Sequence, residues 1–132
     1  MRAPGGSKVP RKILIIDDSP LVLELTRCAL ADEGYDVSVA ATLDEFESLR
    51  QAEPPDLILV DVQMPEAFGD DLTALLRGAY SVKVPIFLLS SLGDDELAVR
   101  AAAADATGFI SKRAGLDKLV ARVHEAVGRG AK

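Results

Sequence analysis

The sequence predicts an α/β domain in which five parallel strands alternate with five helices, and three observations lead to this prediction. Continuous apolar runs at residues 13–16, 57–60 and 86–89 have the length of strands that are covered on both faces. Segments with helical periodicity separate these runs. The 132 residues suit one domain, because domains most often have roughly 100–150 residues.

Two weaker segments complete the predicted sheet. Residues 36–40 alternate polar and apolar side chains and residues 107–110 are short, so both suit the edges. Right-handed crossovers then give a doubly wound (βα)₅ sheet with strand order 2-1-3-4-5. Such sheets bind ligands at the carboxyl ends of their strands, where the chain reverses direction between strands 1 and 3.

The first helix has a clear predicted start and stop. Ser19 suits the N-cap, Pro20 the first helical position, and Gly34 the end of the segment. The apolar positions that we expect to face the core are Leu21, Leu25 and Cys28.

The other four helices have similar signals. Thr42 and Glu45 form a capping box at the start of the second helix, whose apolar positions are Leu43, Phe46 and Leu49. The third spans about 70–77 and ends at Gly78. The fourth starts with three acids at 94–96, which the helix dipole favours, and is mostly alanine afterwards. The apolar stripe of the fifth, which ends at Gly128, is Leu116, Leu119, Val120, Val123 and Val127.

Composition sets the outer limits of the interpretation. Residues 1–10 are rich in Gly, Pro and small polar residues and predict a flexible leader, followed by a domain at 11–129 and a tail at 130–132. One cysteine cannot form an internal disulfide, and no apolar run suits a membrane span or signal peptide, so we expect a cytoplasmic protein. A net charge of −6 argues against direct binding of nucleic acid.

Charged and hydroxyl side chains gather at the predicted switch point. Asp17 and Asp18 follow the first strand and Asp61 follows the third, so three carboxylates converge there. Such a cluster needs a cation, and oxygen-only ligands suit Mg²⁺, with Mn²⁺ as a substitute. Ser90 ends the fourth strand, and Lys112 follows the fifth.

This set of residues favours phosphoryl transfer over other chemistry. The only histidine, His124, lies on the last helix, where we expect a solvated side chain, so no Ser/His or Cys/His pair supports acyl transfer. A carboxylate nucleophile, a divalent cation, a lysine and a hydroxyl are the parts that phosphoryl transfer needs. An aspartyl phosphate is the expected product.

Four segments, in order at these strand ends, resemble the receiver domain of bacterial two-component response regulators, a flavodoxin-like fold. The resemblance runs from about residue 12 to 127, and its closest pattern is the single-domain, chemotaxis-regulator type. The segments are Ile15-Ile16-Asp17-Asp18-Ser19, Asp56-Leu57-Ile58-Leu59-Val60-Asp61-Val62-Gln63-Met64-Pro65 with Gly69, Val84-Pro85-Ile86-Phe87-Leu88-Leu89-Ser90-Ser91, and Gly108-Phe109-Ile110-Ser111-Lys112.

The resemblance implies a role for each site residue. Asp61 would accept a phosphoryl group from a sensor histidine kinase or a phosphotransfer protein. Metal ligands would be Asp17, Asp18, Asp61 and the backbone carbonyl of Gln63. Lys112 would contact the phosphoryl oxygens, Ser90 would move to bind them, and Phe109 would rotate inward.

The implied function is a signalling switch, not an enzyme with an external substrate. The domain would catalyse only its own phosphorylation and slow dephosphorylation. Its output would pass through helix 4, strand 5 and helix 5 to a downstream protein effector or a phosphorylation-linked homodimer. Too few residues follow Val127 for an output domain, so we expect a stand-alone regulator or the receiver of a longer protein.

Arg113 departs from the family pattern, which usually has a cis proline after the lysine. The bond before Arg113 is therefore either trans or a non-proline cis bond, which costs about 3–4 kcal/mol. This departure supports one alternative, a pseudo-receiver that binds partners without being switched. A second alternative, a haloacid-dehalogenase type of phosphohydrolase, needs a second acid two residues after the nucleophile, where this chain has Gln63. Flavin or dinucleotide binding lacks a Gly-rich turn after the first strand.

Overall fold

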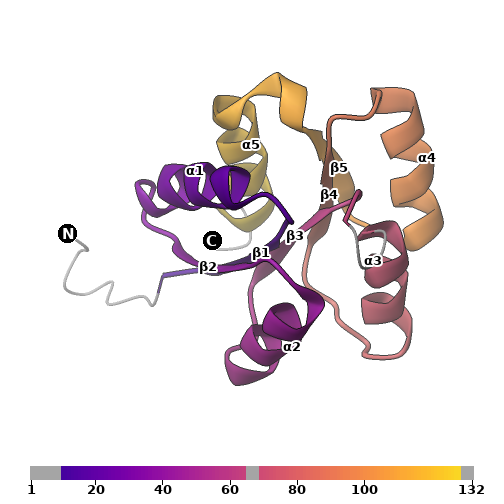
Figure 1. Cartoon of the computed structure of the whole chain (residues 1–132), viewed down its shortest axis with the longest axis horizontal. Helices are drawn as coiled ribbons and strands as arrows, with labels where there is room; N and C mark the ends of the chain where they lie inside the picture. Colours follow the sequence, from indigo (N-terminus) through magenta and orange to yellow (C-terminus); the bar gives the residue numbers. More distant parts are fainter. Residues whose placement is uncertain (1–9, 65–68, 129–132) are drawn as a thin grey trace.

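The computed structural model describes residues 10–64 and 69–128, and its five parallel strands lie in the order β2-β1-β3-β4-β5 (Figure 1). The strands are β1 Lys12–Ile16, β2 Asp36–Ala40, β3 Leu57–Asp61, β4 Ile86–Ser90 and β5 Gly108–Ser111. The predicted fold class, strand order and edge strands are therefore confirmed. The predicted leader, apart from Pro10, and the predicted tail lie outside the described residues.

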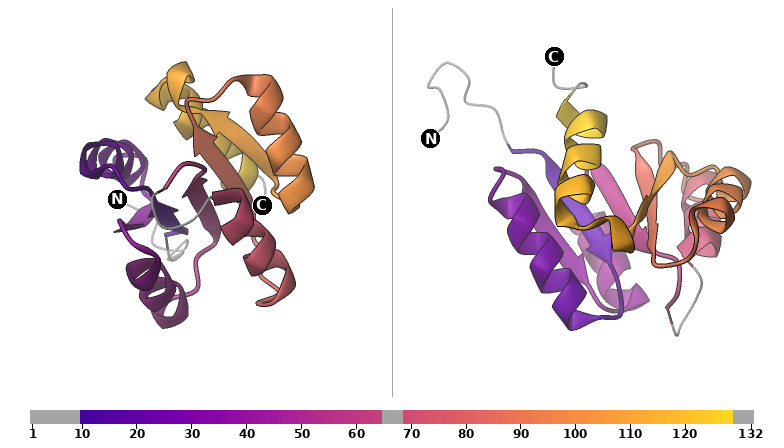
Figure 2. Two further views of the ribbon diagram at one scale, coloured as in Figure 1. Left: turned by 45° about the vertical axis from the view of Figure 1, so that its right-hand side comes forward. Right: turned by 90° about the horizontal axis from the view of Figure 1, so that it is seen from above.

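The sheet separates two apolar cores, because successive side chains of a strand point to opposite faces. In β1, Ile13 and Ile15 pack on one face, and Leu14 and Ile16 pack on the other. Helices α1 (Pro20–Ala31) and α5 (Leu116–Val123) cover the first face. The helices on the second face are α2 Leu43–Ala52, α3 Gly69–Gly78 and α4 Asp94–Ala104. The views in Figure 1 and Figure 2 show α1 beside α5, and α3 beside α4.

The starts of α1 and α2 follow the predicted capping chemistry. Ser19 Oγ accepts a hydrogen bond from Val22 N at 3.3 Å, and Thr42 Oγ1 accepts one from Glu45 N at 3.2 Å. The carboxylate of Glu45 accepts from the N–H of Ala41 at 2.7 Å, one residue before the N-cap. Among the described residues, no helix is long and apolar enough to span a membrane.

The predicted core face of α1 is wrong. Leu21 is 68% exposed, Leu25 is 49% exposed and Cys28 is exposed. The side chains of this helix that are buried are Leu23, Thr26 and Leu30. Both sets have helical spacing, so periodicity alone cannot tell them apart, and the contacts with the sheet and α5 decide the rotation of the helix. Cys28 instead lies on the outer side, where Sγ is 3.4 Å from Glu24 Oε2.

The last helix extends to Gly128 as predicted but changes geometry near its end. Its α-helical part stops at Val123, and a π-helical turn covers His124–Gly128. Leu119, Val123 and Val127 are buried, while Leu116 is 37% exposed. His124 is exposed, as predicted, and also bonded: its Nδ1 lies 2.6 Å from Tyr35 Oη and its Nε2 lies 3.1 Å from Glu33 Oε1.

Candidate functional site

The carboxyl ends of two strands bring the three acidic residues together, as the sequence predicts. Asp17 and Asp18 follow β1, and Asp61 is the last residue of β3. Ile16 pairs with Val60 in the sheet register, which sets these carboxylates side by side. Oxygens from the three side chains all lie within 4.8 Å of one another. The crevice at the switch point is therefore a compact acidic site.

Asp17 is fully buried and held by the start of α1. Its Oδ1 accepts a hydrogen bond from Ser19 N at 2.9 Å, and Ser19 in turn caps α1. Its Oδ2 lies 2.7 Å from Lys112 Nζ but accepts no well-oriented hydrogen bond from any described residue. This buried oxygen therefore has a charge partner, and it has spare capacity for a ligand.

Asp61 is only 2% exposed, and its charge is costly in this position. Its Oδ1 accepts hydrogen bonds from Gln63 N at 3.2 Å and from Lys112 Nζ at 3.4 Å. Burial and the charge of Asp17 raise the pKa of Asp61 to about 6, against the lowering effects of Lys112 and Gln63. At neutral pH the carboxylate is mostly ionised, and a second cation would stabilise it.

Lys112 connects the two buried acids, although its neighbour departs from the family pattern. Burial favours the neutral amine, but the close carboxylates of Asp17 and Asp61 outweigh it and raise the pKa of Lys112. No peptide bond among the described residues is cis, so the bond before Arg113 is trans. A trans bond therefore still allows Lys112 to reach both carboxylates.

The two predicted switch residues lie on neighbouring strands. Ser90, at the end of β4, is 1% exposed, and its Oγ accepts a hydrogen bond from Leu92 N at 3.0 Å. Leu89 pairs with Asp61 in the register, so Ser90 lies one residue beyond the acid on the next strand. Phe109 in β5 is partly buried against the core beneath α2, α3 and α4. Both positions are compatible with the roles that the resemblance implies, and those roles stay predictions.

Gly69 has a tighter contact with the site than the sequence shows. A Cβ atom at this position would lie 2.1 Å from the Asp61 carbonyl oxygen, and Gly69 N donates to Val62 O at 2.9 Å. The resemblance includes this glycine, but only the structure gives its physical reason. A glycine at the first position of α3 is a weak signal of such close packing.

The residues at the crevice fit a hard divalent cation. The donors are carboxylate oxygens, the set that Mg²⁺ prefers, and exposed Asp18 leaves one side open to bound water. The buried Asp17 Oδ2, which has only Lys112 as a charge partner and accepts no well-oriented hydrogen bond from a described residue, has room for a metal ligand bond. Gln63 lies next to the site, where its N–H donates to Asp61, and the role of its carbonyl stays a prediction. Mn²⁺ would suit the same ligands.

Comparisons with known proteins identify the family of the domain. A model of the response regulator receiver domain matches residues 13–124. The chain is 33% identical over 117 residues to the transcriptional regulatory protein KdpE of Mycobacterium tuberculosis, and this match covers 89% of the chain and 51% of KdpE. It is also 30% identical to the phosphate regulon transcriptional regulatory protein PhoB of Pseudomonas aeruginosa, covering 87% of this chain and 51% of PhoB. The chain thus spans about half the length of these curated relatives.

Solved structures share the fold. The chemotaxis protein CheY4 of Vibrio cholerae superposes with a TM-score of 0.82 at 28% identity, covering 89% of this chain and 99% of CheY4. The BeF₃-activated receiver domain of Klebsiella pneumoniae RstA superposes with a TM-score of 0.80 at 32% identity, covering 88% and 97% of the two chains. The chain belongs to the family of response regulator receiver domains of two-component systems.

Proposed function

We propose that this domain is a phosphorylation-dependent switch whose phosphoacceptor is Asp61. The observation that carries the proposal is the placement of one buried carboxylate between two acids and a lysine at the switch point of the sheet. The phosphoryl donor would be a phosphohistidine on a sensor histidine kinase or a phosphotransfer protein in the cytoplasm. Family membership supports this assignment, because receiver domains are generally signalling modules without another catalytic activity.

In the transfer step, a carboxylate oxygen of Asp61 attacks the phosphorus atom. The new P–O bond forms as the P–N bond to the donor histidine breaks, and the imidazole nitrogen leaves with the electron pair. Both described contacts of the Asp61 carboxylate involve Oδ1, so we assign the attack to Oδ2. Lys112, which already contacts Oδ1, would stay close enough to pair with the phosphoryl oxygens.

The acidic crevice would hold Mg²⁺ during this step. Its ligands would be the carboxylates of Asp17, Asp18 and Asp61 and the carbonyl of Gln63. When bound, the metal ion neutralises negative charge on the phosphoryl oxygens and on the acids that surround them. Lys112, which lies against both buried acids, would help to keep the acceptor carboxylate in position.

The switch would act through Ser90, Phe109 and α4. A phosphoryl group on Asp61 adds contacts for the Ser90 hydroxyl, which favours a second arrangement of the chain after β4. Helix α4 is weakly anchored, because its buried side chains are Leu97 and two alanines, Ala101 and Ala104. The changed face of α4, β5 and α5 would then bind a downstream protein effector or a second copy of the domain.

A small phosphodonor tests this proposal directly. Incubation with acetyl phosphate or phosphoramidate and Mg²⁺ should add the mass of one phosphoryl group, and Asp61→Asn should prevent this gain. Asp105→Asn is the control acid, since Asp105 lies at the far end of α4, and it should be phosphorylated like the wild type. No gain in wild-type protein would reject the switch and favour the unswitched interaction domain.

A further inference from the structure

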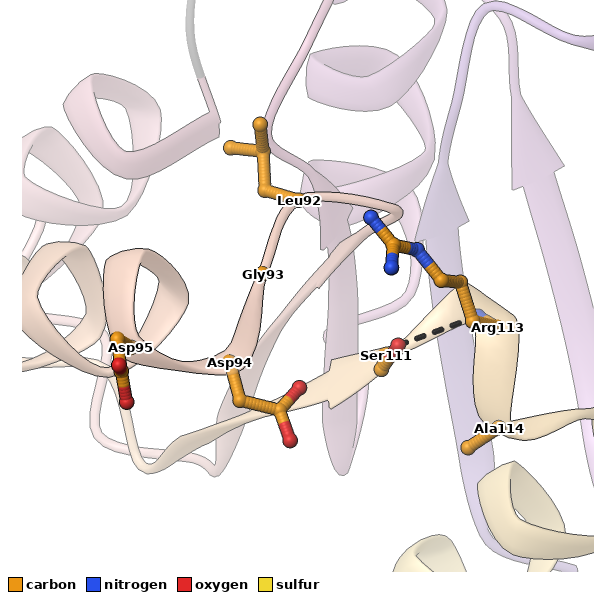
Figure 3. Close-up of a pocket in the computed structure, with 7 residues that line it drawn as sticks. All are labelled: Leu92, Gly93, Asp94, Asp95, Ser111, Arg113 and Ala114. Atoms are coloured by element: carbon orange, nitrogen blue, oxygen red, sulfur yellow. Dashed lines mark hydrogen bonds between the residues drawn. The ribbon is translucent and has the colours of Figure 1, made fainter.

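The strand that ends at Ser90 and the strand that Lys112 follows end side by side. Ser90 pairs with Ser111 in the register of β4 and β5, so the loops that follow leave the sheet at the same point. An open pocket of about 530 Å³ separates the two loops (Figure 3). Its lining residues include Leu92, Gly93 and Asp94 from the first loop and α4, and Ser111 and Arg113 from the second.

Arg113 bridges these two loops. Its backbone N–H donates to Ser111 Oγ at 3.2 Å, which caps the short 3₁₀ turn at Lys112–Ala114. From this turn, the Arg113 side chain extends toward the loop after β4 (Figure 3), and its Nε donates to the carbonyl oxygen of Ser91 at 2.9 Å. Arg113, the residue after Lys112, thus holds Ser91, the residue after Ser90.

The bridged loop keeps Ser90 in an arrangement that the switch must leave. Ser90 Oγ accepts a hydrogen bond from the N–H of Leu92 at 3.0 Å. The residue between them is Ser91, whose carbonyl oxygen Arg113 holds. The proposed function has the Ser90 side chain move toward a phosphoryl group on Asp61, and a rotation of that side chain would break its bond with Leu92 N. Because Arg113 fixes the Ser91 carbonyl, the backbone next to Ser90 cannot move freely, and this makes the movement of the Ser90 side chain more costly in free energy.

We propose that Arg113 is a positioning residue that holds the loop after β4 in its unphosphorylated arrangement, and so sets how easily the domain switches. The proposal rests on the proposed function, in which Ser90 moves when Asp61 is modified. It predicts that loss of the Arg113 side chain favours the switched arrangement. A residue that merely stabilised the site would have the opposite effect on ligand binding.

Two substitutions separate the hydrogen bond from the charge. Arg113→Ala removes both, while Arg113→Lys keeps the positive charge and has a methylene group at the position of Nε. Arg113 is exposed, so both variants should fold, which circular dichroism checks. Lys118→Ala is the control for a lost surface charge, because Lys118 is an exposed cation on the neighbouring helix α5.

The probe is beryllofluoride with Mg²⁺, and its apparent affinity is measured by isothermal titration calorimetry. Both Arg113 variants should bind about three- to fivefold more tightly than wild type, as expected for the loss of one ordinary hydrogen bond from the unbound state. Lys118→Ala should bind as wild type does. Unchanged or weaker binding in Arg113→Ala would overturn the proposal, and weaker binding in Arg113→Ala alone would assign the effect to charge.

A second measurement keeps this proposal separate from the proposed function. Hydrogen exchange of the Leu92 amide, followed by NMR without beryllofluoride, should be faster in both Arg113 variants than in wild type and Lys118→Ala. Unchanged exchange would reject the bridge even if beryllofluoride binds. If wild-type protein does not bind beryllofluoride, the phosphorylation switch fails, and the exchange rates alone decide whether Arg113 holds the loop.

Discussion

Asp61 is a buried carboxylate whose ionisation works against folding. Its pKa in the folded chain is about 6, above the ordinary value of 3.8. Between these two pH values the folded chain binds the proton while the unfolded chain has released it. The contribution of Asp61 to stability therefore falls as pH rises through this window, and the loss is complete above pH 6 or so.

Asparagine cannot ionise, so Asp61→Asn should remove this pH-dependent loss of stability. Without divalent metal, Asp61→Asn should raise the free energy of unfolding at pH 7.5 by about 1–2 kcal/mol. The gain should shrink toward pH 4.5, where the wild-type side chain is protonated. Urea unfolding at both pH values measures the difference, and a gain that is independent of pH would contradict the assignment.

Gly69 lets the start of α3 lie directly against the backbone of Asp61, the proposed phosphoacceptor. In Gly69→Ala, the new Cβ would collide with the Asp61 carbonyl, an atom of backbone that cannot rotate away. We expect a loss of about 2–4 kcal/mol in the free energy of unfolding, similar to other overpacked or strained buried positions. Gly78→Ala, at the other end of the same helix, is the control. A Cβ there has no neighbour within 4 Å, so little change is expected, and an equal loss in both variants would refute the collision.

For strands and helices, prediction from the sequence worked best where the apolar pattern agreed with the residues that begin or end an element. The three apolar runs became β1, β3 and β4 because strands covered on both faces need an apolar residue at every position. Helix α1 was different, since Leu21, Leu25 and Cys28 have helical spacing just as the buried Leu23, Thr26 and Leu30 do. Only packing against the sheet and α5 selects the second set.

The candidate site could be predicted only in part, for a similar reason. Position along a strand was enough to gather the three acids and Lys112. The bond between Arg113 and Ser91 depends on the register of β4 with β5 and on the turn after β5, which no local pattern specifies. The contact of Gly69 with Asp61 depends on how closely α3 begins beside β3.

Arg77 joins three segments at the amino ends of β4 and β5, the end of the sheet opposite the site. From the end of α3 its guanidinium donates to the carbonyls of Val82 and Val84 at 2.9 and 2.7 Å. It also donates to the carbonyl of Asp105 at 2.9 Å and to the Thr107 hydroxyl at 3.2 Å. These bonds fix the start of β4 and the turn between α4 and β5.

Lysine cannot reproduce this planar set of donors. Arg77→Lys should therefore lower the free energy of unfolding by about 1–3 kcal/mol, measured by urea denaturation. Arg27→Lys is the matched control, because Arg27 makes only side-chain contacts with Glu24 and Cys28 among its described bonds, on the exposed side of α1. The bridging role would be wrong if the two variants lost the same amount.

For the whole molecule, the net charge of −6 includes three acids concentrated in one crevice. A cation that binds there only in the folded state must stabilise the domain, by about 2.7 kcal/mol when free metal is 100 times its Kd. Mg²⁺ should therefore raise the thermal unfolding midpoint of wild-type protein, and Asp18→Asn should reduce the increase. Protons compete at Asp61, so the effect of Mg²⁺ should weaken below a pH of about 6.

In the proposed switch, modification of one buried acid, Asp61, changes a distant face of the domain. Amide NMR spectra of wild-type protein with Mg²⁺, recorded before and after beryllofluoride, test it most directly. Shift changes should extend from Asp61 through Ser90 to α4, β5 and Phe109, and Asp61→Asn should remove them. Changes confined to the acidic crevice, or equal changes in Asp61→Asn, would contradict the account.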